Sequence, residues 1–216
     1  MKKILVWDLP VRVFHWALLV LVVFSFVTGT LGGFTIMDYH MWSGYAILAL
    51  ILFRIGWGFV GGSNARFANF IASPARTIHY ARTLRSAGPS VGHNPLGALS
   101  IVALLLSLAV QVATGLFAND DILLEGPLAH LVSYDTSRWL TGIHETNRWI
   151  IVALVTLHVA AIAYYQFIKR DNLLAPMITG RKEVPDDLAP EPNNWLRGAI
   201  LLAATGGIVY LLVTYV

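Results

Sequence analysis

The chain has 216 residues, of which 56% are hydrophobic and only 12% are charged. Because a soluble domain has about 25% charged residues, this composition predicts an integral membrane protein. The formal net charge is only +3 and no basic stripe is present, which argues against a nucleic-acid partner. The chain also has no cysteine, which excludes disulfides, thiolate-bound iron–sulfur clusters and covalently attached c-type haem.

Five segments are long and apolar enough to cross a bilayer, which takes roughly 20 residues per helix. In chain order they are Val11–Leu31, Met41–Val60, Pro95–Ala118, Thr141–Ile168 and Leu196–Val216. The first follows two lysines, as in a secretory signal peptide, but it is too long for a signal core and further spans follow it. A proline-containing linker, Glu183–Asn194, precedes the last span. The sequence therefore predicts an all-α membrane protein with five transmembrane helices.

Lysine and arginine are concentrated in alternate connections between the spans. Eleven lie in the N-terminal tail, after the second span and after the fourth: Lys2, Lys3, Arg12, Arg66, Arg76, Arg82, Arg85, Lys169, Arg170, Arg181 and Lys182. The opposite connections contain Arg138. Because basic residues stay on the cytoplasmic side, we expect a cytoplasmic N-terminus, an external C-terminus and, in a bacterium, a location in the inner membrane.

Four of the seven histidines lie at the ends of spans or inside them. His144 and His158 are fourteen residues apart, which is about 21 Å along a helix and nearly the same face. His40 opens the second span and His144 opens the fourth, both on the external side. His15 lies in the first span near the level of His158, although His158 looks deeper. Two stacked bis-histidine pairs are typical of two haems b, because neutral imidazoles serve as axial ligands of haem iron. A single interfacial histidine also occurs as an ordinary polar residue, whereas an ionisable residue well inside a span is usually functional.

The fourteen-residue interval also separates Gly29 from His15 and Arg54 from His40, and further cofactor-binding residues are expected on the faces that carry the histidines. Glycines on these faces would let a flat macrocycle approach the backbone, and ordinary small-residue helix packing is the alternative: Gly29, Gly44 and Gly115. Three arginines are candidate partners for haem propionates: Arg12, Arg54 and Arg148. The alternative for these arginines is that they extend toward lipid headgroups.

Several motifs resemble the bacterial cytochrome b561 family, including its hydrogenase-type b cytochromes. They are "RVFHW", "YHMWSG", "GIHETNRWIIVALVTLH" and "KRDNLLAPMITGRK". "GHNPLGALS" and "ATGLFANDD" further resemble the branch associated with periplasmic c-type haem proteins. The resemblance implies a four-helix core in residues 1–182 that holds two haems b, with His15, His40, His144 and His158 as ligands. Residues 183–216 then form a linker and an additional transmembrane helix, which leaves a homo-oligomer possible.

The resemblance implies electron transfer between the quinone or quinol pool and a periplasmic partner, such as a c-type cytochrome or a hydrogenase, with no catalytic residue of its own. Arg12, His93 and Asn94 are candidates for a cytoplasmic quinone site, although "HNP" is also typical of a helix cap. The acidic external connection with Asp120 and Asp121 could attract a basic cytochrome, or it could be an ordinary solvated loop.

Two other functions compete with electron transfer. The first alternative is a superoxide:quinone oxidoreductase, which would need a cationic external surface to attract the anion, whereas the external connections here are acidic. The second is a proton or metal transporter that uses intramembrane histidines. A transporter would be colourless, so a visible spectrum of the purified protein separates it from both haem proteins.

Overall fold

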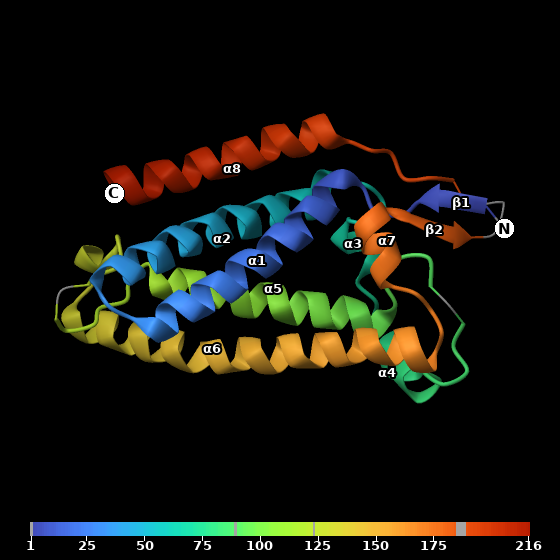
Figure 1. The fold of residues 1–216 in the computed structure, drawn as a ribbon, viewed down its shortest axis with the longest axis horizontal. Coiled ribbons are helices and arrows are strands. Elements are labelled where there is room, and N and C mark those ends of the chain that lie inside the picture. The colour runs from blue at the N-terminus through green and yellow to red at the C-terminus, as the bar shows by residue number, and fades with distance from the viewer. Residues whose placement is uncertain (1, 89, 123, 185–188) are drawn as a thin grey trace. The chain divides into compact units, whose positions relative to one another are not determined.

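The structure is a computed structural model, and it describes residues 2–88, 90–122, 124–184 and 189–216. Its long helices are α1 (Leu9–Leu31), α2 (Phe34–Val60), α5 (Pro95–Gly115), α6 (Tyr134–Ala163) and α8 (Trp195–Tyr215) (Figure 1). A π-helix, Tyr164–Ile168, continues α6. All five are long and apolar enough to cross a membrane. The prediction of an all-α membrane protein with five spans is confirmed.

Two helices begin about two turns earlier than the sequence predicts. The second span begins at Phe34 instead of Met41, and the fourth at Tyr134 instead of Thr141. The prediction that His40 opens its span was therefore wrong, and so was the same prediction for His144. Polar residues before each histidine look like a loop in the sequence, but polar residues at a membrane interface can form the first turns of a helix.

The chain divides into two compact units, and each is described by itself. The first comprises residues 1–13, 55–104 and 154–199, and the second comprises residues 14–54, 105–153 and 200–216. The first unit also contains the short elements: β1 (Lys2–Leu5), β2 (Arg181–Val184), α3 (Phe67–Phe70), α4 (Pro74–Arg82) and α7 (Leu174–Thr179).

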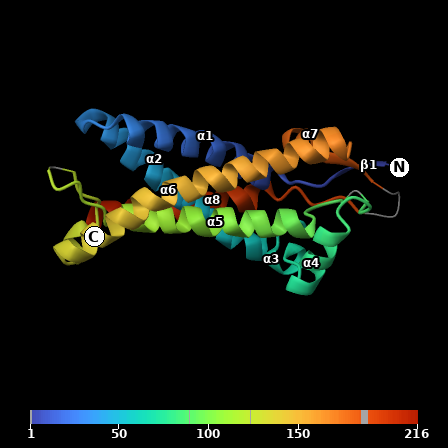
Figure 2. The ribbon, with the colours of Figure 1, turned by 90° about the horizontal axis from the view of Figure 1, so that it is seen from below.

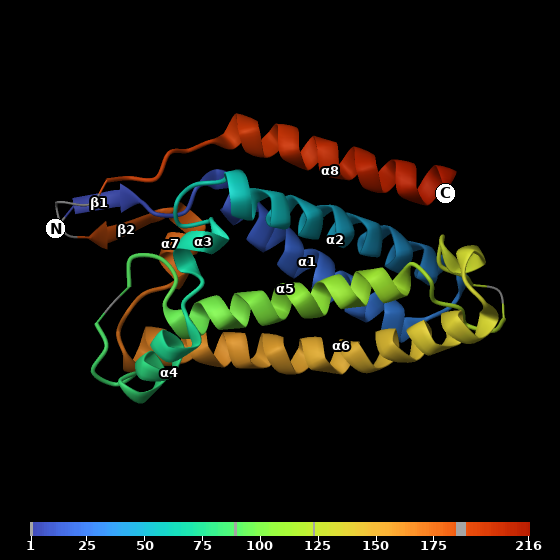
Figure 3. The same cartoon turned by 180° about the vertical axis from the view of Figure 1, so that it is seen from behind.

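In the first unit, β1 and β2 pair as an antiparallel ribbon, with Lys2 opposite Val184 and Leu5 opposite Arg181 (Figure 3). The sequence did not predict this ribbon, because a stretch as polar as β2 resembles a linker. Gly180 ends α7 with a φ of +81° and accepts hydrogen bonds from the backbone of Val6, at 2.7 Å, and of Trp7, at 3.1 Å. This left-handed turn suits glycine, and it returns the chain from α7 into β2.

The segment before α8 is also bound to the first unit. The Glu191 carboxylate accepts hydrogen bonds from the backbone amides of Ser63, at 2.8 Å, and Asn64, at 3.1 Å, and from the Ser63 hydroxyl. Asn193 Oδ1 accepts from the Leu9 amide at 3.1 Å. The part of the predicted linker that the structure describes is therefore held by specific side-chain contacts, whereas Pro185 lies outside the described residues.

In the second unit, α5 and α6 lie side by side (Figure 2), joined by a buried polar network. Asn147 Nδ2 donates to the Ser107 carbonyl and to Gln111 Oε1, both at 2.8 Å, and Ser107 Oγ donates to Asn147 Oδ1 at 3.0 Å. Gln111 Nε2 donates to the His144 carbonyl at 3.1 Å. In hydrocarbon these groups have no water to bond, so the network fixes the register of the two helices.

Candidate functional site

The second unit contains a cavity of about 470 Å³. Its walls come from α1, α2, α5 and α6 and from the connection between α5 and α6, and both His40 and His144 line it. Cavities of roughly 300–1,000 Å³ hold small molecules and cofactors. The volume suits an organic cofactor better than a single ion.

The imidazoles of His40 and His144 lie next to each other. Their ring centroids are 6.1 Å apart and their planes are perpendicular, at 89°. A metal–imidazole nitrogen bond is about 2 Å long. One metal bonded to a nitrogen of each ring, with the two rings on opposite sides of it, would therefore place the centroids about 6 Å apart. The observed spacing fits a single metal between the two rings.

Each of these rings is oriented by a backbone carbonyl of a neighbouring helix. His40 Nδ1 lies 2.8 Å from the Ser25 carbonyl oxygen, and His144 Nδ1 lies 2.8 Å from that of Gln111. Because a carbonyl oxygen only accepts, Nδ1 is the donor in each contact, and in a neutral ring Nε2 then carries the lone pair. Metal-binding histidines commonly use one nitrogen for the metal and the other for such a hydrogen bond.

Two imidazoles alone do not satisfy a bare metal ion, which typically needs four ligands or more. Within the described residues, no group of three or more His, Cys, Asp or Glu side chains converges on a common point. A metal held here would need its remaining ligands from a second source, as in a metal–macrocycle complex. The donor set, the ring spacing and the cavity together fit a haem with His40 and His144 as axial ligands.

The three predicted glycines lie around this cavity. A Cβ on Gly29 would be 2.7 Å from Cε1 of His40, and a Cβ on Gly115 would be 2.8 Å from Cε1 of His144. Both glycines therefore make room for an imidazole ring, a contact that the sequence did not indicate. Gly44 lines the cavity, and its missing side chain leaves open space.

The three predicted arginines have different surroundings. Arg148 lines the cavity, and its buried Nε has no hydrogen-bond partner among the described residues. Arg54 belongs to the same unit and is 4% exposed, but it is not among the residues described as lining this cavity. Arg12 belongs to the first unit, where its Nη1 donates to the Ile178 carbonyl at 2.8 Å. Of the three, Arg148 fits best a negatively charged group inside the cavity.

The second predicted histidine pair is divided between the units. His15 belongs to the second unit, where its ring meets that of Trp16 at 5.1 Å, and His158 belongs to the first. Their pairing remains a prediction.

The residues predicted for a quinone site are integrated into the first unit. The His93 ring packs between Trp7 and Phe70, with both centroid distances at 4.6 Å. Asn94 Oδ1 accepts a hydrogen bond from the Gly97 amide at 2.8 Å, at the start of α5. The contact of Asn94 is that of a helix cap, the alternative drawn from the sequence.

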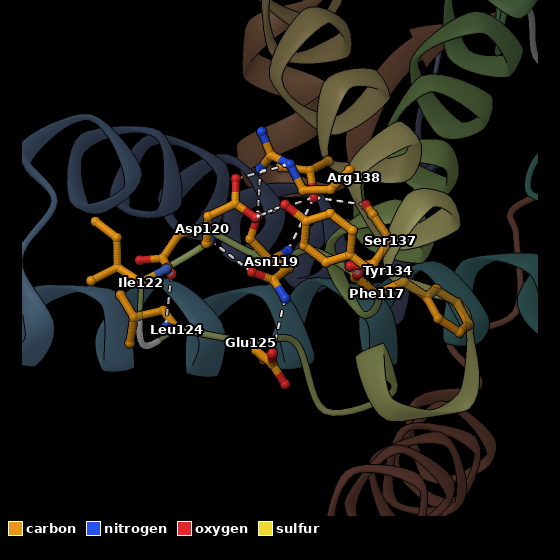
Figure 4. A network of polar contacts seen from close by, with 11 residues as sticks. Phe117, Asn119, Asp120, Ile122, Leu124, Glu125, Tyr134, Ser137 and Arg138 are labelled. Atoms are coloured by element: carbon orange, nitrogen blue, oxygen red, sulfur yellow. Dashed lines mark hydrogen bonds and ion pairs between the residues drawn. The ribbon is translucent and has the colours of Figure 1, made fainter.

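The connection between α5 and α6 lines the same cavity. It is a loop held together by side-chain hydrogen bonds and an ion pair (Figure 4). Arg138 Nε pairs with Asp121 at 3.0 Å, and its Nη1 donates to the Asn119 carbonyl at 2.9 Å. The Tyr134 hydroxyl donates to Asp121, and Asn119 Nδ2 donates to Glu125, each at 2.9 Å. The charge of Arg138 is therefore compensated within the loop, and the remaining surface charges are mainly acidic.

The sequence analysis selected none of Ser25, Gln111 and Asn147 as site residues. The available signal was their polarity inside apolar spans, because buried polar groups in a membrane usually have a specific role. The role of each depends on a partner from another helix, which no single segment of sequence displays.

Comparison with known proteins gives a consistent family. A sequence profile of prokaryotic cytochrome b561 matches residues 6–180. A probable Ni/Fe-hydrogenase B-type cytochrome subunit of Azotobacter chroococcum mcd 1 is 25% identical, over 84% of this chain and 89% of the relative. A protein of the same description from Bradyrhizobium diazoefficiens is 26% identical, over 84% and 86%. The probable Ni/Fe-hydrogenase 1 B-type cytochrome subunit of Escherichia coli K12 is 23% identical, over 81% and 88%. No solved structure matches the chain significantly.

Proposed function

Because this chain belongs to the prokaryotic cytochrome b561 family, we propose that it is a di-haem cytochrome that transfers electrons across the bacterial inner membrane. It is a multi-pass membrane protein of a b-type cytochrome family. The proposed path joins the quinone or quinol pool to a redox partner on the external side. When bound, haem b supplies the one-electron chemistry of its iron.

The observation that carries this proposal is the adjacent pair of His40 and His144. Their spacing, perpendicular planes and carbonyl-bound Nδ1 atoms support axial ligation of one haem through Nε2. Gly44 leaves room along the cavity wall, and the unpartnered Nε of Arg148 would donate to a propionate. Burial of the arginine charge would then be compensated by a carboxylate.

His15 and His158 would ligate the second haem, as the sequence pattern predicts. His158 follows His144 by fourteen residues on α6, so the two ligands lie at levels about 21 Å apart along that helix. Two haems at different depths would divide the membrane crossing into shorter electron-transfer steps. The orientation predicted from basic residues would place the His40–His144 haem toward the external side.

The names of the relatives support a hydrogenase as the redox partner, because those proteins are described as cytochrome subunits of Ni/Fe-hydrogenases. A soluble c-type cytochrome is the second candidate, favoured by the acidic loop that lines the haem cavity. Asp120 and Glu125 would attract a basic protein to this loop. Superoxide oxidation is less well supported, because the cation of Arg138 is already paired with Asp121 and Arg148 is the proposed partner of a propionate.

Purification of the full chain in detergent tests the proposal directly. We expect a b-type spectrum with two haems per chain, and one haem each in His40→Ala and His144→Ala. His130→Ala is the matched control, because this exposed histidine lies outside the cavity, and it should retain both haems. Retention of two low-spin haems by His144→Ala, or a colourless wild-type protein, would refute the proposal.

Electron exchange identifies the partner. Rapid reduction of the haems by a Ni/Fe-hydrogenase and hydrogen supports the first candidate. Rapid reoxidation of reduced haem by a basic c-type cytochrome, weakened by salt, supports the second.

A further inference from the structure

Two segments of the second unit contact the two cavity-lining histidines, His40 and His144, in the same way. They are Ser25–Gly29, "SFVTG", on α1, and Gln111–Gly115, "QVATG", on α5. Each begins with the residue whose carbonyl bonds a histidine Nδ1, and each ends with the glycine that lies against the same imidazole. In the first segment the histidine is His40 of α2, and in the second it is His144 of α6.

The carbonyl at the start of each segment also accepts a threonine hydroxyl. Thr28 Oγ1 lies 3.1 Å from the Ser25 carbonyl and 2.8 Å from that of Phe24. Thr114 Oγ1 lies 3.1 Å from the Gln111 carbonyl and 2.7 Å from that of Val110. A threonine hydroxyl that bonds back to its own helix is common. Here, however, the hydroxyl and the imidazole share one acceptor oxygen in both segments.

The glycine at the end of each segment fixes how closely the ring approaches. The 2.7 Å and 2.8 Å distances from the missing Cβ positions to Cε1 are shorter than any normal carbon–carbon contact. Any larger residue would push the imidazole away from its carbonyl. Each segment therefore combines an acceptor that selects the Nδ1–H tautomer with a wall that selects the ring position.

Threonine followed by glycine occurs five times in this sequence, and the other pairs begin at Thr141, Thr179 and Thr205. A Cβ added to Gly142 or Gly206 would have nothing within 4 Å, and one added to Gly180 would meet Trp7, Leu5 and Arg12. The two pairs that meet a histidine are those on α1 and α5. The shared geometry is therefore a property of these two segments and not of the dipeptide.

We propose that Ser25–Gly29 and Gln111–Gly115 are two copies of an imidazole receptor, in which Thr28, Gly29, Thr114 and Gly115 are positioning residues that set the tautomer and plane of the two axial ligands. This inference rests on the proposed haem ligation by His40 and His144. It adds that α1 and α5 determine the electronic properties of that haem through the ligands of α2 and α6. A stronger Nδ1–H bond gives the imidazole more anionic character, stabilises ferric iron and lowers the midpoint potential.

Thr114→Val tests the receptor without changing the described cavity wall, because Thr114 does not line the cavity. Without the hydroxyl, the Gln111 carbonyl should bond His144 more strongly, so the midpoint potential of one haem should become more negative. The electron paramagnetic resonance (EPR) signal of the same haem should shift, and Thr114→Ser should restore both values. Thr205→Val is the matched control, because its buried hydroxyl bonds only Leu202 of its own helix among the described contacts.

Gly115→Ala tests the wall, and Gly142→Ala is its control on the helix that carries His144. The first variant should shift or broaden one of the two low-spin EPR signals or release that haem, and the second should leave both signals unchanged. A folded Gly115→Ala protein with two wild-type EPR signals overturns the inference. So does a Thr114→Val protein whose potentials are unchanged or more positive.

Failure of the receptor and failure of the proposed function give different results. If the receptor inference is wrong, the wild-type protein still binds two haems and His144→Ala still loses one. Only the receptor variants then show no change in potential or EPR signal. If the proposed function is wrong, the wild-type protein lacks the haem that depends on His144, before any receptor variant is compared. If Gly115→Ala fails to fold, Thr114→Val decides alone, since it removes a hydroxyl and keeps the side-chain shape.

Discussion

Asn147→Leu removes the central residue of the buried network between α5 and α6 and keeps a side chain of similar size. Asn147 is 6% exposed and makes three hydrogen bonds, two to Ser107 and one to Gln111. Interhelical hydrogen bonds in membranes contribute on average about 0.6 kcal/mol each. Three such bonds give about 2 kcal/mol, so we expect the free energy of unfolding to fall by that amount.

Ser107→Ala provides a graded comparison, because it removes only the bond from Ser107 Oγ to Asn147 Oδ1. Its expected cost is about 0.6 kcal/mol, roughly a third of the cost of Asn147→Leu. Unfolding in mixed micelles with increasing sodium dodecyl sulfate, followed by far-ultraviolet circular dichroism, measures both variants against the wild type. The reasoning is refuted if Asn147→Leu is no more destabilising than Ser107→Ala.

Two further predictions concern the first unit. Burial, with a smaller contribution from the nearby Glu191 carboxylate, raises the pKa of Asp8 above its ordinary value of 3.8. Between the ordinary pKa of the unfolded chain and the raised pKa of the folded protein, the folded protein therefore binds more protons. Stability should therefore fall as the pH rises through that window, and Asp8→Asn should remove this part of the slope when thermal unfolding is measured against pH. Lys169 Nζ donates to the carbonyls of Leu84, Arg85 and Ala87 at 2.9, 3.1 and 2.6 Å. Lys169→Met should therefore loosen the chain around these carbonyls and speed tryptic cleavage after Arg85. An unchanged cleavage rate would contradict this role of Lys169.

The helices could be predicted from the sequence because each depends on a local property. A run of about 20 apolar residues has few alternatives to a transmembrane helix. Helix geometry alone then places His144 and His158, fourteen residues apart, on nearly the same face. The helix starts were missed because interfacial polar residues, such as Asp38 before His40, resemble a loop. Local composition does not distinguish an interfacial first turn from a connection.

The surroundings of the histidines could not be predicted in the same way. Gly29 and Gly115 were chosen as small residues that would let a macrocycle approach the backbone, whereas the structure brings each against an imidazole ring. That contact requires two helices in a particular register. In the case of α5 and α6, the register is set by bonds between residues more than thirty positions apart, such as Gln111 and His144. One sequence shows that the residues are polar or small, but not which partner they meet.

These contacts give α5 a role that its composition conceals. It carries no histidine, yet the Gln111 carbonyl orients the His144 ring, Gly115 limits its approach, and the Gln111 side chain bonds the His144 backbone. A polar side chain inside a span has a cost in hydrocarbon that simple helix packing would not offset, because leucine would fill the same space. A glutamine at position 111 is explained if a fixed position of the His144 imidazole matters more for function than the stability of the α5–α6 pair. A helix without a ligand would then be part of the redox site, because it determines the ligand supplied by its neighbour.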